Sequence, residues 1–134
     1  MYKRQIGSLA DAVAHGESIT PILIGRHAEQ GDAIAMELLL ETADWLAVGI
    51  VTLMHTIDPS AIILGGAMTF GREDHPVGRA FLDRIDTCVR RHTFPTLAEK
   101  TAIRFATLGG NAGSIGAAGL GRLAWKQHNT PMHA

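Results

Sequence analysis

The feature that most restricts the fold of this chain is a short apolar run, Ala61–Leu64, that stands between Pro59 and a glycine pair. Four apolar residues in a row, without polar alternation, are typical of a strand buried on both faces, as in the middle of a parallel sheet. Neighbouring parallel strands need crossover connections, which are usually helices. The run therefore predicts an α/β fold, with helices before and after this strand.

Three helices are predicted before the strand. They run from Ser8 to His15, from Pro21 (with Thr20 as N-cap) to about Gln30, and from the N-cap Asp32 to about Ile57. The third helix carries few polar residues, so we expect it to be buried on most sides. Asp58-Pro59 ends it, because proline cannot continue the helical hydrogen bonds.

After the strand, the sequence predicts a helix from about Val77 to His92, a strand from Thr101 to Thr107 and a last helix from the N-cap Asn111 to about His128. The apolar residues of the last helix are expected to be buried: Ile115, Ala118, Leu120, Leu123 and Ala124. Its glycines indicate that another backbone packs closely there: Gly113, Gly116, Gly119 and Gly121. Because sheets usually hold about four to six strands, the sequence predicts the end of an α/β lobe whose first strands are missing.

Composition narrows the class of protein. The formal net charge of the 134 residues is −1, which is not the basic excess of a nucleic-acid-binding surface. Cys88 is the only cysteine, so no intrachain disulfide forms, which fits a reducing compartment. The longest apolar stretch contains Glu37, Glu41 and Asp44, which argues against a membrane span. With no signal-peptide pattern at the start, we expect a cytoplasmic protein in which this chain contacts neither membrane nor nucleic acid.

Two glycine pairs are the candidate binding features. Gly65-Gly66 follows the first strand, and Leu108-Gly109-Gly110 follows the second. Ligands of open α/β sheets bind outside the carboxyl ends of the strands, and glycines leave the backbone bare for a flat group such as adenine or ribose. Each pair alone is also explained by a plain turn. Because parallel strands end at the same edge of a sheet, the two pairs together predict one shared crevice.

Catalytic and metal-binding patterns are missing from the sequence. None of the seven histidines has a partner at metal-ligand spacing, and the chain has no Cys-x-x-Cys. It also has no phosphate-binding P-loop. The sequence therefore predicts no catalytic residue and no metal ligand in this chain.

Four segments together resemble consecutive blocks of the ROK family (repressors, open reading frames and kinases). They are Ala28–Ala35, Leu46–Ile50, Asp58–Gly66 and Leu108–Ala118. Their order and spacing both match, and the resemblance extends from about Glu17 to Trp125. It implies the two-lobed actin-like ATPase (ribonuclease H-like) fold, with this chain as the C-terminal part of the second lobe, truncated before its first three strands.

The resemblance also implies a function. Kinases of the family transfer the γ-phosphoryl group of ATP, with magnesium, to a hexose, so the parent protein is expected to be a glucokinase-type enzyme and a homodimer. The alternative is a sugar-sensing transcriptional repressor that has lost its DNA-binding domain by truncation. The adenosine-side glycine pair of the family falls on Gly65 and Gly66, and Ala67 and Met68 are expected to border the same pocket.

Other functional motifs of the family lie upstream of Ile6. They include the catalytic aspartate, the phosphate-binding motifs and the sugar-binding motif, together with the ligands of the structural zinc that many members hold. We therefore expect this chain alone to be inactive. Residues 1–5 resemble a translated sequencing adapter, residues 6–128 form the partial lobe, and residues 129–134 are expected to be a frayed tail.

Overall fold

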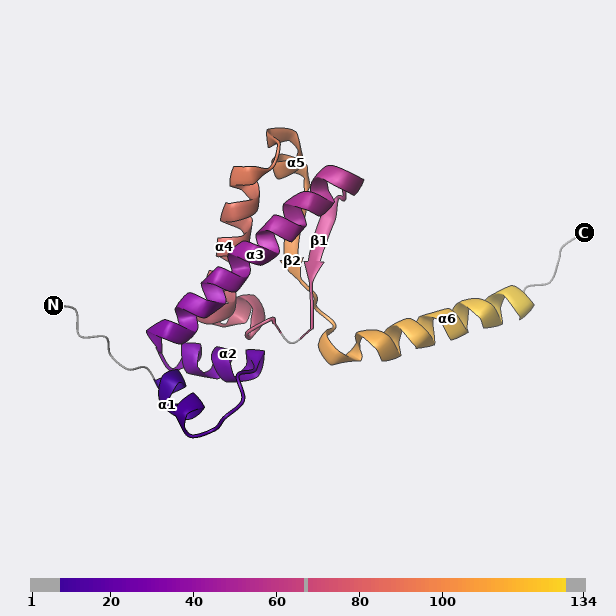
Figure 1. The fold of residues 1–134 in the computed structure, drawn as a ribbon. Helices are drawn as coiled ribbons and strands as arrows, with labels where there is room; N and C mark the ends of the chain where they lie inside the picture. Colours follow the sequence, from indigo (N-terminus) through magenta and orange to yellow (C-terminus); the bar gives the residue numbers. More distant parts are fainter. Residues whose placement is uncertain (1–7, 67, 130–134) are drawn as a thin grey trace, which may run out of the picture.

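The computed structural model describes residues 8–66 and 68–129. In chain order, the elements are α1 (Ser8–Ala14), α2 (Pro21–Glu29), α3 (Ala33–Ile57), β1 (Ala61–Leu64), the 3-10 helix η1 (Arg72–Asp74), α4 (Pro76–His92), α5 (Pro95–Lys100), β2 (Ala102–Phe105), the 3-10 helix η2 (Gly109–Asn111) and α6 (Ala112–Asn129). Helices α3 and α4 pack along each other beside the strands, α1 and α2 lie at one end of α3, and α6 projects away from the rest (Figure 1). The predicted mixture of helices and parallel strands is confirmed.

The two strands are parallel, with Ala61 opposite Ala102 and Leu64 opposite Phe105. The predicted strand Ala61–Leu64 is confirmed, but the expectation that both of its faces are buried is wrong. Ile62 and Leu64 pack against the core, whereas the side chain of Ile63 is 61% exposed. Within the described residues, the helices cover one face of this two-stranded sheet, so alternate residues of β1 remain open to solvent.

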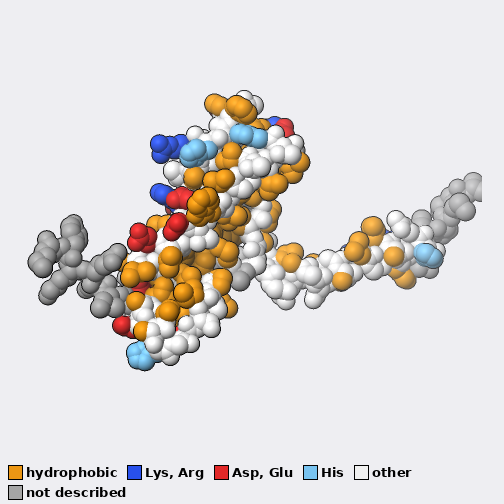
Figure 2. Space-filling view, viewed as in Figure 1, with side chains coloured by type: hydrophobic (Ala, Val, Ile, Leu, Met, Phe, Trp, Pro, Cys, Tyr) orange, Lys and Arg blue, Asp and Glu red, His pale blue; other side chains and the backbone are white. Residues whose placement is uncertain are grey.

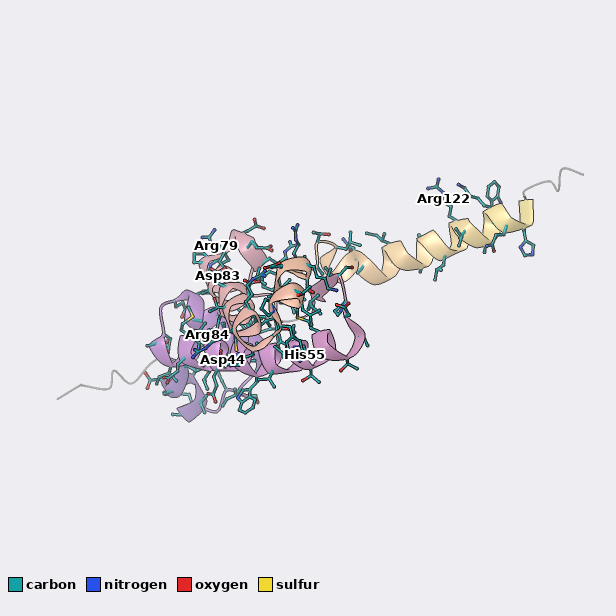
Figure 3. All side chains as sticks on the ribbon, turned by 90° about the horizontal axis from the view of Figure 1, so that it is seen from above. Asp44, His55, Arg79, Asp83, Arg84 and Arg122 are labelled. Atoms are coloured by element: carbon teal, nitrogen blue, oxygen red, sulfur yellow. The ribbon has the colours of Figure 1, made fainter. Side chains whose placement is uncertain are left out.

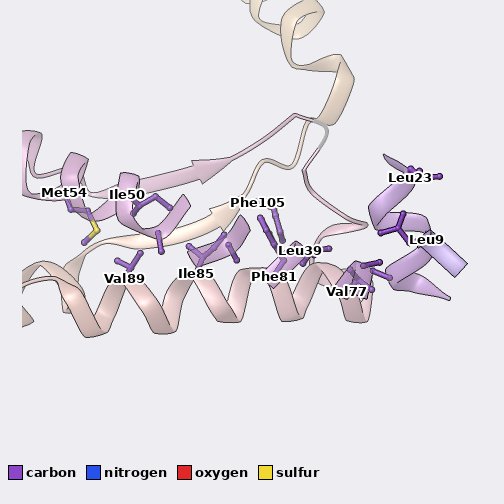
Figure 4. Packing of buried hydrophobic residues seen from close by; sticks show 14 residues of the cluster. Leu9, Leu23, Leu39, Ile50, Met54, Val77, Phe81, Ile85, Val89 and Phe105 are labelled. Carbon is purple, nitrogen blue, oxygen red and sulfur yellow. The ribbon is translucent and has the colours of Figure 1, made fainter. Parts of the chain in front are cut away.

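The core lies between α3 and α4 (Figure 4). Its residues recur every four positions along both helices: Ala35, Leu39, Ala43 and Ala47 on α3, and Val77, Phe81, Ile85 and Val89 on α4. Such rows form ridges that pack into the grooves of a neighbouring helix. The three alanines on α3 let the larger α4 side chains approach the α3 backbone closely.

The opposite side of α3 carries exposed apolar side chains, so the expected burial on most sides is wrong. Trp45 is 70% exposed, and Val48 and Ile57 are more than half exposed. Figure 2 shows apolar side chains spread over this face of the molecule. The described neighbours α2 and α4 cover one flank of α3. The residues of α3 on that flank include the small alanines, and its largest side chain, Trp45, lies outside it.

The expectation that α6 is buried is also wrong. Its apolar residues are exposed, with Leu120 at 72% and Leu123 at 57%. A Cβ atom added at any of its glycines would meet no other atom within 4 Å, so no backbone packs closely there in the described structure. Neither α6 nor any other helix in the described ranges is both long and apolar enough to cross a membrane.

Helix α5 is missing from the sequence prediction, which treated Phe94-Pro95 only as a stop. Pro95 is the first residue of α5, a position that proline favours because its missing N–H has no partner there anyway. The extra turn of helix brings the chain back to the start of β2.

Arg84 and Asp44 join α4 to α3 at the surface (Figure 3). Arg84 Nε and Nη2 donate to the two carboxylate oxygens of Asp44, each at 2.7 Å. This hydrogen-bonded pairing lowers the pKa of Asp44 and raises that of Arg84. Both side chains are substantially exposed, so the pair contributes little to the stability of the fold.

Asp32 anchors two helices with one carboxylate. Its Oδ1 accepts hydrogen bonds from the amides of Ile34 and Ala35 at the start of α3, and its Oδ2 accepts from the amide of Leu9 in α1 at 2.7 Å. Ser8 also donates to Oδ2 and lies 2.8 Å from His27 Nδ1. In a nucleophilic triad, histidine bridges serine and aspartate. Here serine contacts both, so the cluster holds the helix ends together.

Acid is expected to weaken this anchor. The pKa of Asp32 is held below its usual value, mainly by the hydrogen bond from the Leu9 amide. Such a carboxylate stabilises the fold above its unfolded pKa of about 3.9, and the contribution is lost as the pH falls through the folded pKa. The urea midpoint of the wild type should therefore fall more steeply below pH 4 than that of Asp32→Asn. The exposed Asp83 supplies the control, Asp83→Asn, and equal pH slopes in all three proteins would contradict the expectation.

Candidate functional site

A cavity of about 460 Å³ lies at the carboxyl ends of β1 and β2. Residues from both strand ends line it: Gly65, Gly66, Thr69, Arg72, Ala106, Gly109, Gly110 and Ala112. We call it the glycine cavity. Its volume is within the range of about 300–1,000 Å³ that small-molecule sites occupy. The two glycine pairs that the sequence singled out thus border one crevice, as predicted from the parallel arrangement of their strands.

The glycines present bare backbone to open space. An added Cβ at Gly66, Gly109 or Gly110 would meet no atom within 4 Å, and one at Gly65 would meet only the Cβ of Ala106, at 3.6 Å. Gly66 also has a φ of 83°, a left-handed conformation that side-chain-bearing residues rarely adopt. The backbone of these turns is therefore open to the cavity and is not covered by described side chains.

Of the other two predicted residues, the structure describes only Met68, which is not among the residues that line the glycine cavity. Ala67 is outside the described residues. Met68 is half-buried and packs against the hydrophobic core. A role for these residues in nucleotide binding stays a prediction.

Thr69 and Arg72 line the cavity and were missed by the sequence prediction. Both lie in the segment after β1, which carries no periodic pattern. A glycine at position 71 is a sequence signal for a turn at this point. Its φ of 76° shows that the chain does turn just before Arg72. The turn sends the arginine side chain back towards the end of β2, where Nη1 donates to the carbonyl oxygen of Thr107 at 3.0 Å.

The composition of the lining limits its chemistry. Among the described residues that line the glycine cavity, Arg72 is the only charged one, and none carries a carboxylate, an imidazole or a thiol. Nor do the described residues contain a group of three or more histidine, cysteine, aspartate or glutamate side chains placed to hold a metal ion. The described side chains of the lining therefore supply no general base.

Comparison with known proteins assigns the chain to a family. The sequence pattern of the ROK family matches residues 4–123. The chain belongs to the ROK family. It is 32% identical over 115 residues to an uncharacterised protein of Clostridium perfringens, covering 82% of this chain and 37% of that protein. It is 29% identical over 103 residues to a glucokinase of Halalkalibacterium halodurans, covering 77% of this chain and 28% of the glucokinase.

A solved structure shares the fold. A protein of Cytophaga hutchinsonii described as a sugar kinase superposes on 86% of this chain with a TM-score of 0.67 and 25% sequence identity, and the match covers 36% of that protein. The chain thus spans about a third of the length of the relatives it matches. The comparisons therefore show membership of the ROK family, and the names glucokinase and sugar kinase belong to the relatives.

Proposed function

We propose that this chain is part of an ATP-dependent hexose kinase of the glucokinase type, a cytoplasmic enzyme, and that it supplies part of the adenosine side of the nucleotide pocket. The observation that carries the proposal is the glycine cavity, with bare backbone from two successive strand ends facing a space of about 460 Å³. Gly65 and Gly66 are the proposed nucleotide-binding residues. The glucokinase relationship supports ATP as the nucleotide.

We further propose that residues 6–128 are the C-terminal part of the second lobe of an actin-like ATPase fold, truncated before its first three strands. The exposed apolar residues Ile63 of β1, Trp45 of α3 and Leu120 of α6 support this, because surfaces of this kind are usually covered. The remainder of the parent would cover the open face of the sheet. A second subunit of a homodimer is the proposed cover for the outer face of α3.

The chain by itself is not expected to transfer phosphate. In the parent, ATP would supply the phosphoryl group and magnesium would supply positive charge near the phosphates. None of the described residues that line the glycine cavity has a carboxylate that could take a proton from a sugar hydroxyl. Phosphoryl transfer depends on positioning and on electrostatic stabilisation, and this chain contributes only to the positioning of the nucleoside.

Binding of ADP to the chain tests the proposed role directly. Gly66→Val should weaken ADP binding by more than tenfold, since the branched side chain is strained at a φ of 83° and fills the space above the turn. Gly116→Ala, on α6 and away from the cavity, is the matched control and should bind as the wild type does. Isothermal titration calorimetry measures both. Unchanged ADP affinity in Gly66→Val would refute the assignment of this glycine pair.

The kinase proposal itself requires the longer parent protein. We expect the parent to consume ATP in the presence of a hexose, measured by a coupled ADP-release assay with glucose, fructose and N-acetylated amino sugars. No ATP consumption with any common hexose would reject the kinase. Sequence-specific DNA binding that a sugar relieves would instead establish the repressor alternative.

A further inference from the structure

Residues 68–75, which lie between the Gly65-Gly66 pair and α4, form a loop that contacts with other elements hold in place. Two of the three non-glycine residues with positive φ in the described part of the chain, Phe70 (43°) and Arg72 (57°), lie in it. Left-handed backbone is unfavourable for such residues and persists only where the surroundings impose it. The position of this loop is therefore set by its contacts rather than by its own conformational preference.

Helices on the far side of the loop provide those contacts. The Phe70 ring packs edge-on against Phe81 of the core, with 5.0 Å between ring centroids. Gly78 of α4 leaves room for the loop backbone, because an added Cβ would lie 2.1 Å from the Arg72 carbonyl oxygen and 2.7 Å from that of Phe70. Gly25 of α2 similarly leaves room for the Phe70 ring. The loop is thus fixed to α2 and α4 on one side.

The side chain of Arg72 makes the connection on the other side. Its Nη1 donates to the Thr107 carbonyl oxygen at 3.0 Å and approaches that of Ala106 at 3.5 Å. These carbonyls directly precede the Gly109-Gly110 turn, while the loop itself follows Gly65-Gly66. One guanidinium therefore joins the two walls of the glycine cavity, across a sequence separation of about 35 residues.

We propose that Arg72 is the positioning residue of the glycine cavity. Its side chain fixes the separation of the two glycine turns. The gap between the turns is therefore already formed when a nucleoside binds, and binding does not have to order the turns. Binding to a preformed site avoids the cost of ordering the site on binding. The nucleoside part of this proposal rests on the proposed function, whereas the fixed separation of the turns does not.

Amide hydrogen exchange in the ligand-free chain tests the positioning without any nucleotide. The Ala106 amide donates to the Leu64 carbonyl at 2.7 Å, and the Asn111 amide donates to that of Leu108 at 3.2 Å. Removing the side chain in Arg72→Ala should make both exchange about tenfold faster, because local opening is no longer opposed by the hydrogen bonds of the guanidinium. Arg72→Lys should show a smaller increase, since an ammonium group can still donate to a carbonyl.

Arg79→Ala is the matched control. Arg79 (labelled in Figure 3) also donates from Nη1 to a loop carbonyl, that of Glu73 at 3.2 Å, and it does not line the glycine cavity. It should leave the exchange of Ala106 and Asn111 unchanged. Unchanged exchange in Arg72→Ala, or faster exchange throughout the α3–α4 core as well, would overturn the positioning role whatever the nucleotide result.

Titration with adenosine and ADP then separates the two proposals. If Arg72 acts by positioning, Arg72→Ala should weaken both ligands by a similar factor of about ten. A loss confined to ADP would show a contact with phosphate and would overturn positioning. A third outcome is that Arg72→Ala speeds exchange of the two amides, but the wild type binds neither adenosine nor ADP. In that case the proposed function fails and the positioning role stands.

Discussion

Replacing Gly78 by alanine is expected to lower the free energy of unfolding by about 3 kcal/mol, although alanine is the better helix former. The added Cβ would lie 2.1 Å from the carbonyl oxygen of Arg72 and 2.8 Å from its carbonyl carbon. Those atoms are backbone, so the loop cannot move aside as the end of a flexible side chain could. The loss would be a large part of the 5–15 kcal/mol that typically stabilises a domain.

Gly119→Ala is the matched control, the same substitution in another helix. An added Cβ at Gly119 meets nothing within 4 Å, so only the helix propensity changes, in favour of alanine by up to about 1 kcal/mol. Since α6 projects away from the rest, this gain should increase the helical ellipticity and leave the urea midpoint unchanged. Urea titration followed by circular dichroism measures both effects. Equal midpoints for Gly78→Ala and the wild type would show that the loop does not pack on α4 as described.

Replacing Phe81 by alanine should lower the free energy of unfolding by about 3–5 kcal/mol, the usual range for a large buried aromatic residue. Phe81 is fully buried between α3 and α4, and its ring also contacts the Phe70 ring. Truncation would leave a void in the core and would remove the support of the loop that carries Arg72. We therefore expect a lower urea midpoint together with faster amide exchange at Ala106.

Phe94→Ala is the control for Phe81→Ala. It removes an exposed aromatic ring, so it separates the effect of losing a buried side chain from the effect of losing any aromatic ring. The Phe94 side chain is 67% exposed, and its ring centroid lies 4.7 Å from that of His55. An exposed ring with one such partner should cost less than about 1 kcal/mol when removed. If the two phenylalanine variants unfold at the same urea concentration, the α3–α4 contact is not the core of this chain.

The ends of several helices and strands can be predicted from the sequence alone. Pro59 and Gly65 bracket β1, Asp32 caps α3 and Thr20 caps α2, because caps and breakers act on their immediate neighbours along the chain. The shared crevice is also predictable, since parallel strands place the segments after them at one edge of the sheet. Family membership follows from the order and spacing of the four sequence blocks.

Tertiary structure alone decides which faces are buried and which side chains meet. The periodicity of α3 shows large apolar residues on several sides, and only the position of α4 selects the alanine row Ala35, Ala43 and Ala47 over Trp45. Likewise, α6 has an apolar composition but no described element that covers it. The bonds from Arg72 to the end of β2 depend on a left-handed turn imposed by Gly78 and Phe81, across distances in sequence that no local pattern encodes. Burial and long-range contacts are properties of the assembled chain, because a side chain is buried only when a distant segment packs over it.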